Sequence, residues 1–156
     1  MIWFRAATVA FLLGSAAAST ALACEAPNPL RPELVVFTPV VVRGEVTAIE
    51  IMDDATAVLT LHVTETYKGT AAGTWTVTWG RESVIVPPQT LEAFAATYGL
   101  DVVIGLTPDV PEIAFDGLPA TLDAGAGWLA QENCAVPFLG GYAEMEALLR
   151  ERGLIE

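Results

Sequence analysis

The sequence predicts a mainly β domain, a five-stranded Greek-key barrel with a short helix before the fourth strand and a helix at the C-terminus. Three observations lead to this fold. Side chains alternate between apolar and polar, with the period of a strand, through three runs between residues 40 and 79. Glycines and aspartates separate these runs, as they do in turns. Two segments with helical spacing of apolar side chains follow, one mid-chain and one at the end.

The first three strands are expected to form a meander. Residues 40–51 are rich in β-branched side chains, and Gly44 among them indicates a bulge. The second strand is expected over residues 57–67. The third covers residues 74–79, where tryptophan and valine alternate with threonine. Asp53 and Asp54 fit the turn between the first two strands.

The second half of the chain supplies the remaining elements. Residues 91–98 have an apolar stripe at helical spacing, and residues 101–107 form a nearly continuous apolar run, typical of a strand covered on both faces. Residues 112–127 do not distinguish a strand from loops, because glycine and proline interrupt them. We expect the closing strand over residues 128–134 and the final helix over residues 142–152.

The chain begins with the anatomy of a signal peptide. Arg5 precedes a short apolar stretch, and small residues lead to Ala21-Leu22-Ala23. The apolar part is shorter than the roughly 20 residues that span a bilayer. The sequence therefore predicts a signal peptide over residues 1–23 and one mature domain over residues 24–156, exported to the periplasm or the extracellular space.

The charge of the mature chain excludes one class of partner. It keeps all 19 acidic side chains of the protein and six of the seven basic ones, for a net charge of −13. A nucleic-acid-binding surface needs positive charge to neutralise phosphates. We therefore expect no nucleic-acid partner, and the charge keeps an otherwise apolar chain soluble.

The mature chain contains two cysteines, Cys24 and Cys134. In an oxidising compartment a disulfide between them would close a long loop and contribute about 4 to 5 kcal/mol in the chain-entropy model. Lipidation of Cys24 is an alternative, which would anchor the chain to the envelope membrane. Lipidation sites usually carry leucine three residues before the cysteine, where this chain has Ala21. The third alternative is two free thiols.

The inventory of reactive side chains predicts a non-catalytic protein without a cofactor or a metal site of its own. His62 is the only histidine and lies mid-strand among threonines, which is typical of a solvated position. Trp75, Trp79 and Trp128 are expected in the core, although Trp75 and Trp79 could instead form a stacking platform. We expect a monomer that binds a protein partner.

Four segments resemble bacterial members of the netrin-like family, which includes the tissue inhibitors of metalloproteinases. A mature N-terminal cysteine precedes Val-Val-Val-Arg-Gly-Glu-Val at residues 40–46 and Val-Thr-Glu-Thr-Tyr-Lys-Gly at residues 63–69. Thr-Trp-Thr-Val-Thr-Trp follows at residues 74–79, and Asn-Cys-x-x-Pro-Phe-Leu at residues 133–139 leads into the final helix. The resemblance implies an OB-fold, the five-stranded oligonucleotide- and oligosaccharide-binding barrel.

The resemblance also implies a binding site at the mature N-terminus. In the animal inhibitors, the amine and carbonyl of the first cysteine chelate the zinc of the target metalloprotease, and a disulfide pins that cysteine. Here Cys24, with Glu25 and Ala26, would take this role. The chain departs from the animal pattern, because it has no Cys-x-Cys at the start and only one further cysteine, Cys134. The alternative is an envelope-associated interaction module without inhibitory activity.

Overall fold

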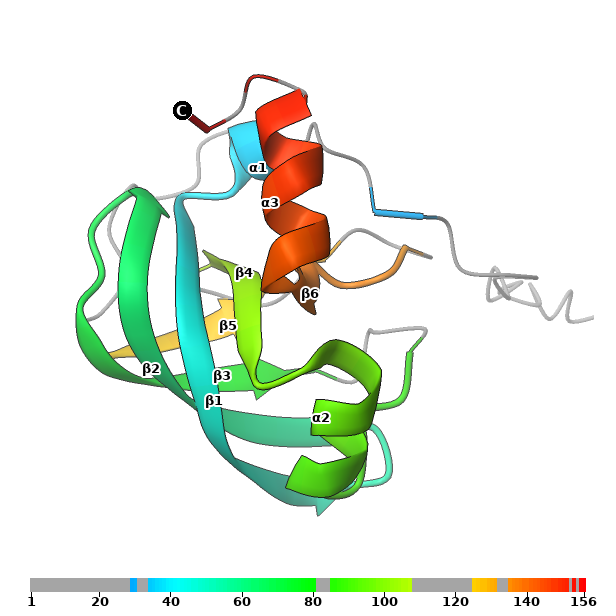
Figure 1. Cartoon of the computed structure of the whole chain (residues 1–156). Coiled ribbons are helices and arrows are strands. Elements are labelled where there is room, and N and C mark those ends of the chain that lie inside the picture. The colour runs from blue at the N-terminus through cyan, green and yellow to red at the C-terminus, as the bar shows by residue number, and fades with distance from the viewer. Residues whose placement is uncertain are drawn as a thin grey trace, which may run out of the picture.

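The computed structural model describes residues 29–30, 34–80, 85–107, 125–131, 135–151, 153 and 155–156. The described chain is mainly β, as the sequence predicts. Its elements are α1 (Leu34–Phe37), β1 (Val40–Asp53), β2 (Thr56–Lys68), β3 (Gly73–Trp79), α2 (Leu91–Tyr98), β4 (Asp101–Thr107), β5 (Ala126–Leu129), β6 (Leu139–Gly141) and α3 (Tyr142–Glu151) (Figure 1).

Two expectations about the strands need correction. The sheet has six strands instead of five, because Leu139–Gly141 pairs with β4 before α3 begins. The closing strand was expected over residues 128–134, but β5 covers Ala126–Leu129. Its pairing with β3 begins at Ala126, two residues earlier than the apolar pattern indicates.

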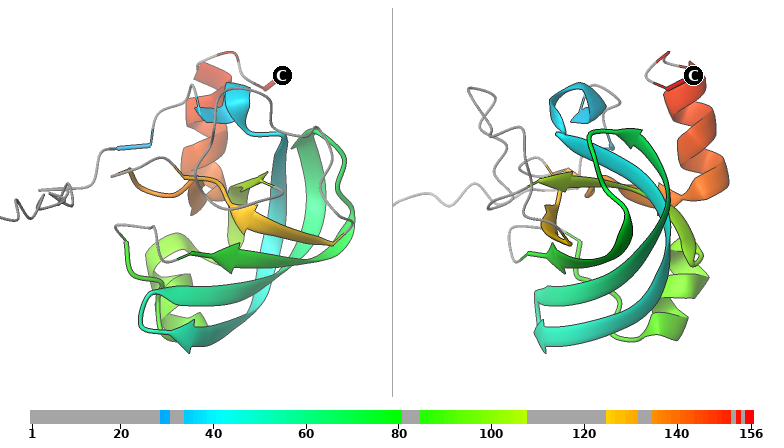
Figure 2. Two further views of the ribbon diagram at one scale, coloured as in Figure 1. Left: turned by 180° about the vertical axis from the view of Figure 1, so that it is seen from behind. Right: turned by 90° about the vertical axis from the view of Figure 1, so that its left-hand side faces the viewer.

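The strand pairings return to their starting point. β1 pairs antiparallel with β2, and its first half also pairs antiparallel with β4. β2 pairs antiparallel with β3, β3 pairs parallel with β5, and β5 pairs antiparallel with β4. The circuit therefore runs β1-β2-β3-β5-β4 and back to β1, and β6 pairs with the same edge of β4 as β5, opposite β1. Figure 2 shows the strong curvature of β1 and β2 that this circuit requires.

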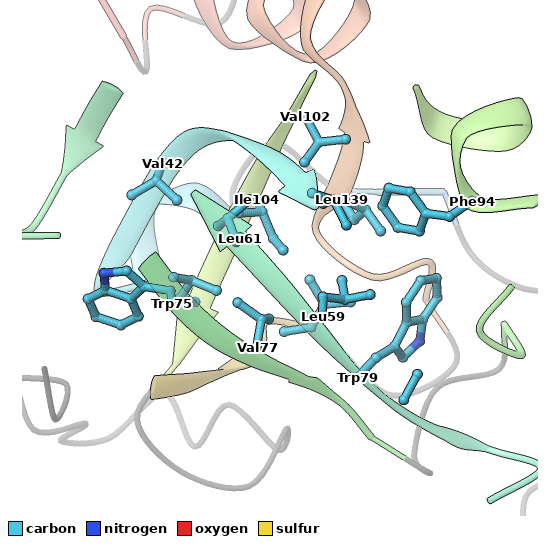
Figure 3. Packing of buried hydrophobic residues seen from close by; sticks show 14 of the residues in the cluster. Val42, Leu59, Leu61, Trp75, Val77, Trp79, Phe94, Val102, Ile104 and Leu139 are labelled. Atoms are coloured by element: carbon cyan, nitrogen blue, oxygen red, sulfur yellow. The ribbon is translucent and has the colours of Figure 1, made fainter. Parts of the chain in front are cut away.

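The main core lies inside this curved sheet. Alternate residues of the strands point inward, so that Val42, Leu61 and Val77 meet across the interior (Figure 3). Trp75 and Trp79 are buried there, with 3% and 0% of their surface exposed, as the alternation with threonine predicts. Phe94 of α2 closes one side of this core. The stacking-platform alternative for these two tryptophans is therefore wrong.

A second apolar cluster lies on the outer side of β1 and β4. Val41 and Val103 point away from the main core and contact Leu34 of α1, Met145 and Leu149 of α3, and Phe138. A Cβ atom at Gly105 would overlap the ring of Phe138, so glycine lets this ring approach the strand. The two clusters together bury β4 on both faces, as its continuous apolar run predicts.

Local signals in the sequence account for the turns and the ends of α2. The register of β1 against β2 shifts between Arg43 and Gly44, where the sequence predicts a bulge or a sharp bend. The carboxylate of Asp53 accepts a hydrogen bond from the backbone amide of Ala55 at 2.9 Å. Thr90 caps α2 by accepting from the amide of Ala93 at 3.1 Å, and Gly99 ends the helix at a φ of 77°.

Candidate functional site

The N-terminal site predicted from the sequence lies outside the described residues. This applies to the leader over residues 1–23, to Cys24, Glu25 and Ala26, and to Cys134. The described residues nearest to Cys24 are 29–30, and those nearest to Cys134 are 130–131 and 135–138. We call these residues the flanks of the two cysteines.

The flanks of the two cysteines pack on the same cluster. Leu30 contacts the second apolar cluster, to which Ala130 and Phe138 belong. Leu30 therefore places the described residues that follow Cys24 on the cluster that contains Ala130 and Phe138.

Gln131 is a buried polar residue in the same region. Its side chain is 2% exposed, and neither its amide nitrogen nor its amide oxygen has a hydrogen-bond partner among the described residues. A buried polar group left without a partner costs about 1 to 3 kcal/mol. The sequence offers no signal for this position, because glutamine is ordinarily an exposed residue.

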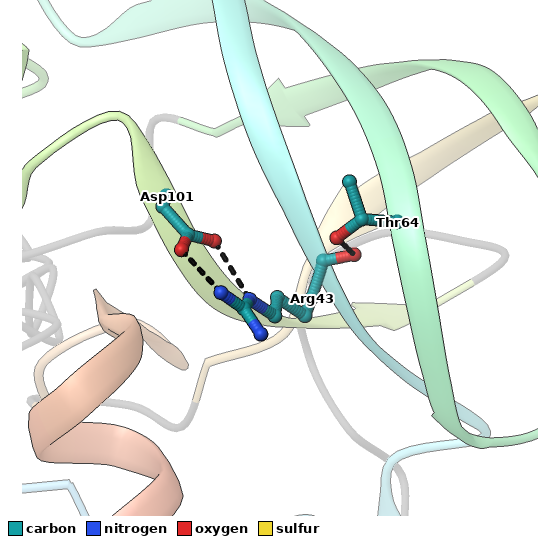
Figure 4. A network of polar contacts seen from close by, with 3 residues as sticks. All are labelled: Arg43, Thr64 and Asp101. Atoms are coloured by element: carbon teal, nitrogen blue, oxygen red, sulfur yellow. Dashed lines mark hydrogen bonds and ion pairs between the residues drawn. The ribbon is translucent and has the colours of Figure 1, made fainter.

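The most extensive polar contacts of the described chain surround Arg43 on β1. Its Nε and Nη2 atoms donate to Oδ1 and Oδ2 of Asp101 on β4, at 2.9 and 2.6 Å (Figure 4). The Arg43 guanidinium also lies 3.3 Å from the ring centroid of Tyr142, the first residue of α3. These hydrogen bonds raise the pKa of Arg43 and lower the pKa of Asp101. We call Arg43, Asp101, Tyr142, Glu146 and Arg150 the Arg43 cluster.

The rest of the Arg43 cluster belongs to α3. Arg150 donates to Oε1 of Glu146 from Nε at 3.1 Å and from Nη2 at 2.7 Å. Hydrogen bonds from Tyr142 and then Arg150 lower the pKa of Glu146. Tyr67 of β2 is close by. Burial raises the pKa of its hydroxyl, which makes no hydrogen bond of good geometry to a described residue. The two arginines and two carboxylates balance in charge. The contact of the Arg43 guanidinium with the ring of Tyr142 connects α3 to β1, and the ion pair with Asp101 connects β1 to β4.

No local feature of the sequence identifies the Arg43 cluster. Arg43 and Asp101 are 58 positions apart, and each stands in an ordinary strand pattern. Tyr142 looks from the sequence like any residue at the start of a helix. Only the pairing of β1 with β4, which aligns Arg43 with Val103, brings the charged groups together.

The outer face of β2 and β3 is polar and solvated. His62 is exposed there, opposite Thr74 on β3 and Glu45 on β1, as its position among threonines predicts. Trp128 needs a correction, because it was expected in the core. It pairs with Thr78 and alternates with the buried Leu129, so that it lies half-buried on the outer side. The sequence does not show this alternation, because residue 127 is a glycine and has no side chain.

The described residues contain no cluster of three or more histidine, cysteine, aspartate or glutamate side chains that could hold a metal ion. Within the same ranges, no helix is long and apolar enough to cross a bilayer.

Comparison of the chain with protein-family models, with curated proteins and with solved structures finds no match.

Proposed function

We propose that this protein is an exported, non-catalytic binding protein of the netrin-like type whose sheet forms a Greek-key barrel of the OB type. The observation that carries the proposal is the circuit of strand pairings, β1-β2-β3-β5-β4 and back to β1, with α2 between β3 and β4. A five-stranded Greek-key barrel is a common scaffold for binding, with function located in its loops and ends. β6 pairs with the edge of β4 that β5 also uses, and α3 packs on the outer face of β4.

The proposed binding end carries Cys24, Glu25 and Ala26. A disulfide from Cys24 to Cys134 would hold the mature N-terminus against the second apolar cluster, on which Leu30, Ala130 and Phe138 already pack. The free α-amine and the carbonyl of Cys24 would then form a bidentate nitrogen and oxygen ligand. Such a ligand fits the open coordination position of a catalytic zinc ion. The partner in this mechanism is a zinc metalloprotease, and the protein acts as its inhibitor.

The first test is the intact mass of the mature protein from its native compartment, measured with and without a reductant. The proposal expects a chain that starts at unmodified Cys24 and gains two hydrogen atoms on reduction. A mass increased by a diacylglycerol and an acyl chain would contradict chelation, because the amine would be blocked. The protein would then be a lipid-anchored interaction module of the envelope.

The second test separates chelation from other modes of inhibition. One variant carries an additional alanine before Cys24, which blocks the chelating amine, and its matched control carries an additional alanine after Glu156. Inhibition of a panel of zinc metalloproteases should be lost in the first variant and retained in the second. Equal inhibition by both variants would show that the amine of Cys24 does not bind zinc.

A further inference from the structure

Beyond the point where β4 ends, one edge of β1 pairs with no described strand, and we call it the unpaired edge of β1. The pairing of β1 with β4 stops at Glu45, and the backbone amide of Val46 donates to the carbonyl of Leu100 at 2.9 Å. From there to Asp53, the described strand that pairs with β1 is β2. No backbone hydrogen bond joins the other edge of residues 48–52 to the part of the chain that the structure describes. Alternate N–H and C=O groups along such an edge can pair with another chain.

The two faces of this edge differ in chemistry. Ile49 and Ile51 are half-buried and pack against the main core. Ala48, Glu50 and Met52 point the other way and are exposed, with 60% of the Met52 surface accessible. Side chains of an added strand would lie alternately on the two faces, every second one beside the isoleucines and the remaining ones beside Glu50. The side chains beside the isoleucines would be apolar, and those beside Glu50 would be positively charged.

Charge disfavours a second copy of this chain at the same edge. An antiparallel contact between two copies would bring the carboxylates of Glu50 together, with Asp53 and Asp54 at the adjoining turn. The described residues include three basic side chains, and each has a partner already. Arg43 binds Asp101, Arg150 binds Glu146, and Lys68 donates to the carbonyl of Val36 at 2.6 Å. Among its described residues, a second copy therefore has no basic side chain without a partner already, which favours another protein as the source of the positive charge.

We propose that residues 48–52 of β1 accept a β-strand from a partner protein, an extended segment in which apolar residues alternate with lysine or arginine. Backbone pairing supplies part of the affinity, and the alternation supplies the specificity. The surface does not include Cys24, so this proposal and the proposed function can fail independently.

The test uses the mature chain and the labelled peptide acetyl-Lys-Val-Lys-Val-Lys-Val-Lys-amide. Its control has the same composition in block order, four lysines followed by three valines. We expect the alternating peptide to bind at least about fivefold more tightly in fluorescence anisotropy. It should also slow hydrogen exchange at residues 48–52. Glu50→Lys should weaken binding about fivefold, since it replaces cross-strand attraction by repulsion.

The matched control variant is Glu151→Lys, which makes the same charge change at the exposed end of α3. It should change the affinity less than about twofold. Equal weakening by both variants, or equal binding of the block peptide, would overturn the proposal in favour of unspecific attraction to an acidic protein. Protection of residues 48–52 that rises with protein concentration in the absence of peptide would overturn it in favour of a second copy.

Discussion

Arg43 connects three elements through a single side chain. It stands on β1, binds the carboxylate of Asp101 on β4 in a bidentate manner, and lies over the ring of Tyr142 at the start of α3. Half of the Asp101 side chain is exposed, and exposed ion pairs contribute little to stability unless their geometry is good. The bidentate arrangement is the favourable case, because it orients both groups.

Replacing Asp101 by asparagine should lower the urea midpoint of unfolding by roughly 0.3 M at neutral pH. Because the pKa of Asp101 is lowered in the folded state, its stabilising effect is complete above the unfolded pKa and is lost as the pH falls through the folded pKa. The difference between the wild type and the variant should therefore shrink below about pH 4. Urea titrations at neutral pH and at pH 2.5 would measure it.

The control for this prediction is Asp54→Asn in the turn after β1, where both residue types fit. It should leave the urea midpoint almost unchanged. A difference for Asp101→Asn that persists at pH 2.5 would mean that its effect does not come from the ion pair.

At the residue scale, the sequence is informative wherever neighbours along the chain decide the position. The alternation of Trp75, Val77 and Trp79 with threonine is sufficient to predict that these three side chains are buried, as they are in the structure. Trp128 was wrongly expected in the core, because its face depends on the register of β5 against β3. The contacts of Arg43 were not predicted for the same reason, because its partners are distant in the chain and are brought close only by strand pairing.

At the element scale, α3 is held against the sheet by one set of apolar contacts and one set of polar contacts. Met145 and Leu149 enter the second apolar cluster, and Tyr142 and Glu146 form the polar side of the attachment. The apolar stripe of this helix was predictable, because its spacing is local. The residues that the stripe covers were not predictable, since Val41 and Val103 belong to strands far away in the sequence.

Two adjacent leucines of α3 test this orientation. Leu149 is fully buried and Leu148 is half-buried. Leu149→Ala should cost about 3 kcal/mol of unfolding free energy, because it opens a cavity beneath the helix, and Leu148→Ala about 1 kcal/mol. Chemical denaturation of both variants measures the difference. Equal losses would mean that α3 does not present the face of Met145 and Leu149 to β1 and β4.

The elements that the sequence did not predict are short. β6 consists of Leu139–Gly141 and has too few side chains to show a strand period. Its existence depends on the pairing of Val102 with Gly141 and of Ile104 with Leu139. The beginning of β5 was missed for the same reason, because alanine and glycine carry no alternation. Tertiary pairing therefore decides these boundaries.

At the scale of the whole molecule, the order of the helices and strands is the feature that the sequence predicts best. Three alternating strands, a helix, a buried strand and a closing strand predict a mainly β chain, and the pairings connect them in a circuit. The candidate site at Cys24 depends on the sequence alone. The Arg43 cluster and the unpaired edge of β1 become visible only in the structure, because both depend on where the pairing of β1 with β4 begins and ends.

β5 has the shortest pairings in the circuit, three residue pairs with β3 and two with β4. Its pairing with β3 is parallel and joins Thr76–Thr78 to Ala126–Trp128, whereas β1 and β2 pair from Val41 and Lys68 to Asp53 and Thr56. Parallel pairs are slightly less stable per residue, and short pairings open without global unfolding. We expect native-state hydrogen exchange to give the β5 amides opening free energies at least about 2 kcal/mol below those of Val103 and Ile104, which lie between β1 and β6. Equal opening free energies in both places would mean that the circuit opens as one cooperative unit, in which β3 and β5 contribute as much to closure as the long strands do.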